Sequence, residues 1–355
     1  MNDERLKVAV VGASGYGGGE LLALLLNHPK VEVNIAVSRK LAGEYVFRTH
    51  PNLRGRTSLK FSPLDMDMIT KESDLVFFST PHGVSKNLVP KVLEVGTKVI
   101  DLSPDFRLRN AEDYPKWYGW EHPYPDILRK AAYGIPELHR DEIRNASLVA
   151  CPGCIALSGI LALVPVAKAH MVEKDKIILD SKIGSSGSGE KPSLSTHHPE
   201  RSGVIRPYMP SGHRHTAEIE QELNLFGGDG HKVGLSAHAV DIVRGILSTA
   251  HVFPNEPVEM KSLWKAYRDV YGNEPFIRLV RDQKGIYRLA DPKVVVGTNF
   301  CDISFEIDSH LDRIVLFSAI DNLVKGAAGS AVQSMDIIHG WEETLGLEFL
   351  GFHPV

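Results

Sequence analysis

Residues 6–26 have the sequence LKVAVVGASGYGGGELLALLL, which joins a strand-like run, a glycine-rich turn and a helix-like run. The first six residues are largely apolar and rich in valine, as in a buried parallel strand. Gly12, Gly15 and Gly18 follow, and residues 20–26 are typical of a helix. This order places backbone N–H groups and the positive end of a helix dipole where a pyrophosphate can bind. The turn therefore predicts a nucleotide site, although glycine-rich turns also form for purely steric reasons.

A second strand-like run, residues 31–37, ends in Ser38-Arg39-Lys40, and Ser38 stands twenty positions after Gly18. A cofactor with a free ribose 2′-hydroxyl usually meets an acidic residue at this place, whereas a 2′-phosphate is accommodated by arginine. Here a hydroxyl and two cations stand where the acid would be. The segment predicts NADP(H) rather than NAD(H), and the alternative is a solvated turn that is basic by chance.

The alternation of strands and helices continues through the first half of the chain. Strand-like runs at 74–79 and 98–102 flank a helical stretch at 84–95. Repeated βα units predict an α/β fold with a doubly wound parallel sheet, whose ligand binds outside the carboxyl ends of the strands. Residues 103–150 are denser in proline, tyrosine and tryptophan, so we expect irregular chain there between two domains.

Cys154 is the candidate nucleophile. Pro152-Gly153 is expected to form a turn, and an apolar helix is expected over 155–169. A thiol at a helix N-terminus has a lowered pKa and reacts as the thiolate. The alternatives are half of a zinc site, a redox pair with Cys151, and a buried structural thiol. The chain has three cysteines, so Cys301 alone remains and no second pair completes a zinc site.

The second half of the chain changes character. A strand-like run at 176–183 opens into a flexible loop at 184–190. The polar stretch that follows holds four histidines, His197, His198, His213 and His215. Four histidines suggest a metal site, but no cysteine lies among them, and we predict no metal. A helix is expected after this stretch, with Thr216 as its N-cap and acidic residues in its first turn.

The remaining strand-like runs follow one another with few long helices between them. This arrangement is typical of a mixed or antiparallel sheet rather than of further βα units. Two helical stretches interrupt the series. The expected strands are 232–239, 246–253, 299–307 and 313–320, and the expected helices are 259–271 and 324–339.

Composition is that of an ordinary globular enzyme, with 355 residues, 43% hydrophobic residues and a net charge of −4. At about 100–200 residues per domain, two or three domains are expected. The charge argues against a generally basic nucleic-acid binder, and no apolar run approaches the ~18–20 residues of a membrane span. The N-terminus does not resemble a signal peptide, and three cysteines are too few for a disulfide framework. We therefore expect a cytoplasmic protein.

Several motifs lie in order along nearly the whole chain. They are the turn at 12–21, DLSPDFR at 101–107, YGIPEL at 133–138, PGC at 152–154, GHRHTAEI at 212–219 and DNLVKGAAG at 321–329. Together they resemble the N-acetyl-γ-glutamyl-phosphate reductases. The resemblance implies a Rossmann-type domain over 1–153, joined by the C-terminal segment 324–355, and an α+β catalytic domain over 154–323. That catalytic domain is of the kind shared by semialdehyde and glyceraldehyde-phosphate dehydrogenases.

The resemblance also implies roles for single residues. Cys154 would attack an acyl phosphate to form a thioester that NADPH reduces, and His213, or as second choice His215, would move the protons. The implied cofactor residues are Gly12, Ala13, Ser14, Gly15 and Tyr16 around the pyrophosphate, Ser38 and Arg39 at the 2′-phosphate, and Asn322 on the nicotinamide side. Candidates for the carboxylate or phosphate of the substrate, which suit the planar fork of arginine, are Arg201, Arg206 and Arg214, with His215 beside them.

One departure separates this chain from the N-acetyl reductases. Cys154 is followed by Ile-Ala-Leu, where those enzymes usually have Tyr-Pro-Thr. Residues 197–208 instead resemble the related reductases of lysine biosynthesis, which act on an aminoadipyl or glutamyl phosphate attached to a small acidic amino-group carrier protein. This implies such a carrier as partner, with a homo-oligomeric enzyme and no nucleic acid or membrane. The alternatives are the free N-acetylated substrate of arginine biosynthesis and a non-catalytic NADP-binding regulator.

Two basic segments stand out in this acidic chain. Residues 39–60 hold six cations against Glu44, and residues 191–216 hold four against Glu200. If the fold brings both segments to the mouth of the cleft that holds Cys154, they form a positive rim that steers an acidic carrier to the enzyme. The alternative is that they face solvent apart from each other.

Overall fold

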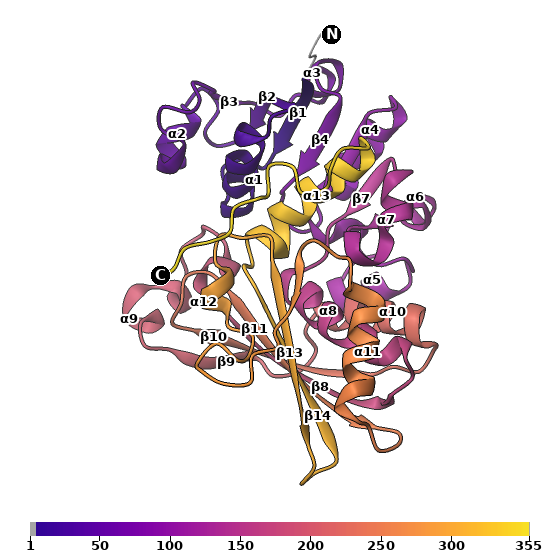
Figure 1. The fold of residues 1–355 in the computed structure, drawn as a ribbon. Helices are drawn as coiled ribbons and strands as arrows, with labels where there is room; N and C mark the ends of the chain where they lie inside the picture. The colour runs from indigo at the N-terminus through magenta and orange to yellow at the C-terminus, as the bar shows by residue number, and fades with distance from the viewer. Residues whose placement is uncertain (1–4, 355) are drawn as a thin grey trace. The chain divides into compact units, whose positions relative to one another are not determined.

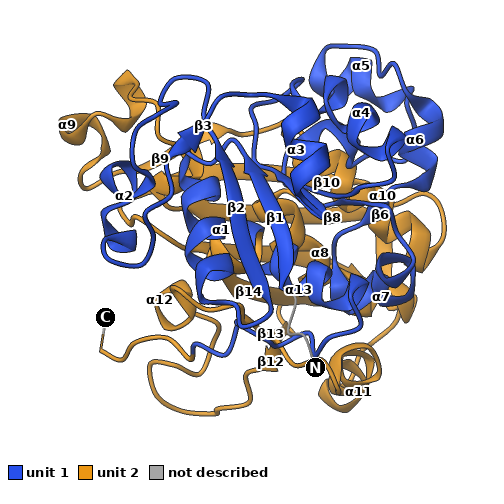
Figure 2. Cartoon of the chain, turned by 90° about the horizontal axis from the view of Figure 1, so that it is seen from above, with its two compact units in different colours: residues 1–152, 327–349 blue, residues 153–326, 350–355 orange. Residues whose placement is uncertain are grey.

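The computed structural model describes residues 5–354. The chain divides into two units, which Figure 2 shows in different colours: residues 1–152 with 327–349, and residues 153–326 with 350–355. We call them the first and the second unit. The C-terminal segment expected to join the Rossmann-type domain is thus shorter than 324–355. Its last residues belong to the second unit, where Gly351 packs against Thr298.

The first unit is built on a seven-stranded parallel sheet, which confirms the predicted doubly wound α/β fold. The strands lie in the order β3-β2-β1-β4-β5-β7-β6. The chain therefore adds β2 and β3 on one side of β1 and then β4 and the later strands on its other side, which makes the position between β1 and β4 a topological switch point. Sheets of this kind bind their ligands at that switch point. The strands are β1 (Leu6–Val11), β2 (Val31–Val37), β3 (Phe61–Ser62), β4 (Leu75–Phe78), β5 (Lys98–Asp101), β6 (Ala132–Tyr133) and β7 (Leu148–Ala150).

Helices from both ends of the first unit's sequence pack together. The C-terminal helix α13 contacts α7, α1 and β5, which places this returning segment in the core of the first unit. The helices are α1 (Tyr16–Asn27), α2 (Val46–Thr49), α3 (Met66–Glu72), α4 (Val89–Glu94), α5 (Asp113–Tyr118), α6 (Pro125–Lys130), α7 (Pro136–Arg144) and α13 (Gly329–Ile338), as Figure 1 shows.

Two expectations for the first unit are wrong. Residues 103–150 are not irregular: they hold α5, α6, α7 and two strands, and Tyr114 is fully buried against Tyr118 and Trp120. The aromatic residues that suggested a surface connection therefore build a small core. The stretch 84–95 is also not one helix, because it divides into a 3₁₀ turn at Ser85–Asn87 and α4. Pro90 fits this division, since proline suits the first turn of a helix and not its interior.

The second unit contains a seven-stranded mixed sheet, as predicted, in the order β12-β13-β14-β11-β8-β10-β9. Only the β10–β8 and β12–β13 pairs are parallel among its described strands. The strands are β8 (Val172–Ile183), β9 (Ile205–Met209), β10 (Val233–Val240), β11 (Ile246–Pro254), β12 (Ile277–Leu279), β13 (Cys301–Asp308) and β14 (Arg313–Ile320).

Helix α8 (Cys154–Lys168) is the centre of the second unit. Every residue from Ile155 to Ala167 is buried, and the helix contacts α10 (His215–Gly227), α11 (Met260–Tyr271) and strands β8, β11 and β14. A helix that is apolar on all sides belongs in a core. Along β11, buried residues alternate with half-exposed ones, so the opposite face of the sheet is less covered. Within residues 5–354, no helix is long and apolar enough to cross a bilayer.

Three local expectations for the second half of the chain are also wrong. Residues 184–190 are not the flexible loop that we expected, because Ser185–Ser188 form a 3₁₀ turn in which Ser186 is buried and its hydroxyl donates to the carbonyl oxygen of Val243. Thr216 is not an N-cap: α10 begins at His215, and Thr216 is buried. The stretch 324–339 begins with a π-helical turn at Val324–Ala328 before α13.

Candidate active site

The turn between β1 and α1 has the form that a pyrophosphate site requires. Gly12 has a φ of +87°, and a Cβ on it would lie 2.3 Å from the carbonyl oxygen of Ser79. A Cβ on Gly18 would lie 2.4 Å from the carbonyl oxygen of Gly12. Both glycines are therefore needed for the close approach of strand and helix. The first turn of α1 has no acidic residue and no side-chain cap among the described residues, so its N–H groups suit an anion.

The end of β2 meets this turn, as the prediction of a 2′-phosphate site requires. The hydroxyl of the buried Ser38 donates to the hydroxyl of Ser14 at 3.1 Å, and Arg39 and Lys40 are exposed beside it. A ring nitrogen of His50 lies 2.8 Å from the carbonyl oxygen of Ala13, and this hydrogen bond supports the turn. No sequence pattern singled out His50, because it follows α2 and its contact with the turn is tertiary. The described residues of the turn and of β2 therefore fit NADP(H).

Cys154 is the first residue of α8, as predicted, and Gly153 is its N-cap. Cys154 is partly exposed, whereas Cys151 and Cys301 are buried. The backbone N–H of Gly153 donates to Glu218 at 2.8 Å. Glu218 is fully buried and comes from α10. The helix N-terminus that carries the thiol is thus held from outside by a carboxylate that sequence reasoning assigned only to helix capping.

His215 lies directly on the turn before Cys154. A Cβ on Gly153 would come within 2.2 Å of Nε2 of His215, so the ring occupies the space that a side chain would need. The same nitrogen lies 3.9 Å from Glu218. One buried carboxylate therefore faces both the turn of the nucleophile and the histidine ring.

His213, the first choice from the sequence, contacts His215. Its ring centre is 4.6 Å from that of His215, and its Nδ1 accepts a hydrogen bond from the backbone N–H of His215 at 3.2 Å. Burial, with the nearby Arg214 guanidinium, lowers the pKa of His213 to about 4. A histidine with this pKa is neutral near pH 7 and has no proton to give. The fold thus places His215, the second choice, against Gly153, and the catalytic roles of both histidines stay predictions.

Tyr208 belongs to the same cluster, although no sequence pattern assigned it a role in the site. Its ring centre lies 6.3 Å from that of His213. Burial of the phenol, followed by the negative charge of Cys154 as thiolate, raises the pKa of Tyr208 to about 12. This holds although 45% of the residue's surface is accessible. Tyr208 thus stays a neutral hydrogen-bond donor over the whole working range of an ordinary enzyme.

The three predicted substrate arginines differ in their exposure and in their hydrogen-bond partners. Arg201 donates to the carbonyl oxygens of Ile183 and Val240, at 3.2 and 2.8 Å, and so ties together the ends of β8 and β10. Arg206 donates to the carbonyl oxygen of Glu200. Arg214 is exposed next to His213. Arg206 and Arg214 are therefore the two exposed arginines among the three, and Arg214 is the one next to His213 in sequence.

Both the oxygen and the nitrogen of the Asn322 side-chain amide make hydrogen bonds. Its oxygen accepts from the N–H of Gly245 at 2.8 Å, and its nitrogen donates to Ser186 at 2.9 Å. The side chain is buried in the second unit and holds two turns together. Its role on the nicotinamide side stays a prediction.

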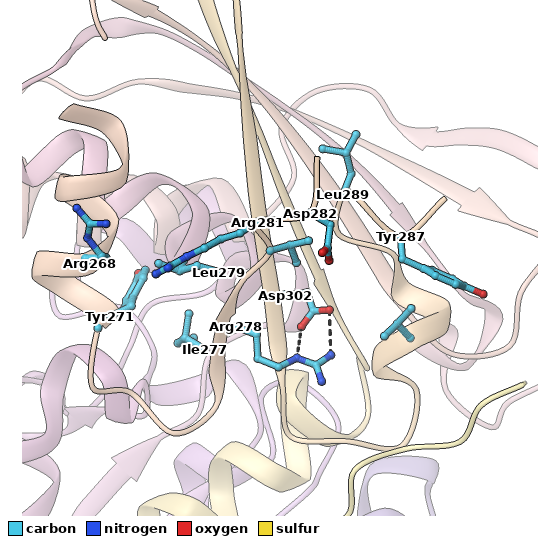
Figure 3. Close-up of a pocket in the computed structure, with 13 residues that line it drawn as sticks. Arg268, Tyr271, Ile277, Arg278, Leu279, Arg281, Asp282, Tyr287, Leu289 and Asp302 are labelled. Carbon is cyan, nitrogen blue, oxygen red and sulfur yellow. Dashed lines mark hydrogen bonds and ion pairs between the residues drawn. The ribbon is translucent and has the colours of Figure 1, made fainter. Parts of the chain in front are cut away.

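A pocket at the edge of the second unit holds none of the predicted residues. Figure 3 shows three arginines in its lining, from α11, from β12 and from the loop that follows β12. Arg278 donates two hydrogen bonds to Asp302, and Arg281 lies over the ring of Trp264. The charge of Arg278 is thus paired within the pocket. Elsewhere in the described chain, no three His, Cys, Asp or Glu side chains gather as a metal site requires.

Comparison with known proteins agrees with this arrangement. Residues 7–146 match the model of the semialdehyde dehydrogenase NAD binding domain, and residues 154–322 match that of the semialdehyde dehydrogenase dimerisation domain. The (LysW)-L-2-aminoadipate/(LysW)-L-glutamate phosphate reductase of Saccharolobus solfataricus is 48% identical, over 99% of both chains. A protein of Nitrosopumilus maritimus with a provisional form of that name is 53% identical, over 99% of this chain and 100% of its own.

Solved structures share the fold. Aspartate semialdehyde dehydrogenase II of Vibrio cholerae, complexed with ASA, has a TM-score of 0.70 at 19% identity and covers 95% of this chain and 98% of its own. The enzyme of Candida albicans with NADP has a TM-score of 0.69 at 14% identity, over 94% and 98% of the two chains. The chain is thus an oxidoreductase that belongs to the semialdehyde dehydrogenase family, on the branch of the phosphate reductases to which it is about half identical.

Proposed function

We propose that this chain reduces a carrier-linked aminoadipyl or glutamyl phosphate to the corresponding semialdehyde, with NADPH as reductant, in lysine or arginine biosynthesis. The observation that carries the proposal is Cys154 at the N-terminus of α8, with His215 packed on the preceding glycine. Relatives of about 50% identity over the full length are named for LysW-linked substrates, which supports the substrate class.

The first step uses the thiolate of Cys154. Its sulfur attacks the acyl carbon, the carbon–oxygen bond to phosphate breaks, and phosphate leaves with the electron pair, so that a thioester remains. The N-terminus of α8 stabilises the thiolate before attack. Covalent catalysis of this kind divides one difficult step into two easier ones.

The second step needs a proton at the acyl oxygen. Bound NADPH supplies the hydride for the thioester carbon. His215, held at Gly153 and facing Glu218, gives a proton to the oxygen and takes it back as the carbon–sulfur bond breaks. Cys154 is then a thiolate again, and the product is an aldehyde. Arg214 is the arginine proposed to face a carboxylate or phosphate of the substrate, because it is exposed beside the histidines.

Arg39→Ala is expected to reduce the preference for NADPH over NADH. Arg39 is exposed beside Ser38, at the predicted 2′-phosphate position. Loss of a charge-assisted hydrogen bond of roughly 1.5–3 kcal/mol corresponds to a roughly ten- to hundredfold rise in the KM for NADPH. The KM for NADH should change little. Arg54→Ala removes an exposed cation of the same segment and is the matched control. Equal use of both cofactors by the unaltered enzyme would contradict the assignment.

A basic surface on the first unit supports an acidic carrier as partner. All six cations of residues 39–60 are exposed, and Arg48 and Lys60 both lie over the ring of Tyr45. The single acid of the segment, Glu44, is bound by Arg48 at 2.7 Å. This surface is positive on a protein whose net charge is −4, and such a contrast steers an oppositely charged partner.

The carrier is expected to raise catalytic efficiency in a salt-dependent way. The assay follows NADP-dependent oxidation of aminoadipate and glutamate semialdehydes, each free, N-acetylated or carrier-linked, with phosphate present. We expect kcat/KM to be far higher for a carrier-linked compound. That value should fall steeply between 0.01 M and 0.1 M salt, as the Debye length shortens from about 30 Å to about 10 Å. Charge reversal at Arg54 and Lys60 should raise the KM for the carrier-linked compound and leave the KM for NADPH unchanged.

Other outcomes of the same assay decide between the alternatives. Efficient, salt-insensitive turnover of N-acetyl-glutamate semialdehyde, without response to the carrier, would keep the reaction and replace the substrate. No turnover of any compound, with NADPH still bound, would favour the non-catalytic regulator.

The half-exposed face of the second unit's sheet supports a homo-oligomer. Thr249 and His251 on β11 belong to it, opposite the face that packs on α8. The family model that matches this unit is a dimerisation domain. We therefore extend the proposal to pairing of two copies through this face.

A further inference from the structure

A π-helical turn begins in the second unit, next to the nucleophile. Val324–Ala328 form the turn, and the N–H of Gly326 donates to the carbonyl oxygen of Asp321 at 2.9 Å, five residues back. Turns of this kind are rare, and they occur frequently at functional sites. A turn of this kind beside the nucleophile therefore indicates a functional role.

Gly326 is packed against Cys154. A Cβ on Gly326 would lie 2.8 Å from the Cβ of Cys154 and 3.4 Å from its Cα. The backbone of Gly326 is not in the left-handed region. Space, not conformational freedom, therefore demands glycine at this position. Any side chain here would push on the nucleophile itself.

Asp321 fixes the turn. The side chain is fully buried, and one of its oxygens accepts from the N–H groups of Leu323 and Val324, at 2.7 and 3.2 Å. The other oxygen accepts from the N–H of Gly297 at 2.7 Å and pairs with Arg244 at 3.4 Å. Four partners from three segments thus hold one carboxylate, and a network of this kind fixes a backbone only while it is complete.

We infer that Gly326 and Asp321 are positioning residues, which set the place of the Cys154 thiol through the π-turn. Gly326 limits how far Cys154 can move toward the turn, and Asp321 keeps the turn where it is. Glu218 restrains the same helix end from the other side, through Gly153. A displacement of about 1 Å at a reacting group can cost about a hundredfold in rate. The inference rests on the proposed role of Cys154 as nucleophile.

The test compares Gly326→Ala with Gly234→Ala. Gly234 lies in β10, where a Cβ would meet the nearest atom at 3.9 Å, so this control adds a methyl group without crowding. We expect Gly326→Ala to lower kcat about a hundredfold, with the KM for NADPH unchanged. Alkylation of Cys154 by iodoacetamide, measured by mass spectrometry across pH, should show a shifted midpoint. Gly234→Ala should match the unaltered enzyme in both readouts.

Asp321→Asn provides the second variant. It keeps the shape of the side chain and removes its charge, and we expect the same two changes in smaller measure. If Gly326→Ala does not fold, the kcat and the alkylation profile of Asp321→Asn test the inference in its place. Normal kcat and an unshifted alkylation profile in the folded variants would overturn the inference. Alkylation needs no substrate, so a shifted profile together with an active Cys154→Ser enzyme would refute the proposed function and not the positioning.

Discussion

Replacement of Cys154 by serine is expected to abolish turnover while NADPH still binds. Cys154 begins α8, where the helix dipole favours the thiolate, and it is the partly exposed cysteine of the three. A serine hydroxyl has no comparable anionic fraction at pH 7 and is therefore a much weaker nucleophile than the thiolate. Removal of a nucleophile costs at least about a thousandfold in kcat. Steady-state rates give the loss, and fluorescence titration with NADPH checks the binding.

Cys151→Ser is the matched control. Cys151 is buried, and burial together with the nearby Asp101 carboxylate raises the pKa of its thiol well above the ordinary value. It therefore stays protonated and inert at neutral pH. We expect substantial activity from this variant. A dead Cys151→Ser enzyme beside an active Cys154→Ser enzyme would contradict the assignment.

The parallel sheet was predictable because its strands are buried on both faces. Residues 6–11 and 31–37 were predicted to the residue, since such strands are nearly continuous apolar runs. The region 103–150 was not predictable in this way. Its helices are short, and Tyr114 is buried where it packs on the half-buried rings of Tyr118 and Trp120. That is tertiary packing, which no periodicity records.

The active site shows the same division. The position of Cys154 was predicted because its signals are local: an apolar run, a Pro-Gly turn and an apolar helix. The contact between Gly153 and Glu218 joins residues 65 positions apart, and Gly326 reaches Cys154 from still further along the chain. The choice between two histidines separated by one residue also depends on which ring the fold turns toward Gly153. Spacing alone cannot decide this.

His215→Asn is expected to lower kcat about a hundred- to ten-thousandfold, the range for loss of a general acid–base group. The ring lies on Gly153 and faces Glu218. Asparagine keeps a planar polar group at this position, is smaller than histidine and carries no titratable proton, so the variant removes the proton transfer. The limb of the pH–rate profile that this histidine produces should disappear. Binding of NADPH, measured by titration, should be unchanged.

His213→Asn separates the two histidines. The oxygen of asparagine can accept the hydrogen bond that the N–H of His215 now donates to His213, so the loop should keep its form. The pKa of His213 is lowered to about 4, mainly by burial. It loses its proton well below neutrality, and its removal should leave the limb assigned to His215 in place with a smaller loss of kcat. If instead His213→Asn erased that limb and His215→Asn kept it, the proton would pass through His213. Contact with Gly153 would then be packing alone, because a titrating group must vanish from the profile when its side chain is removed.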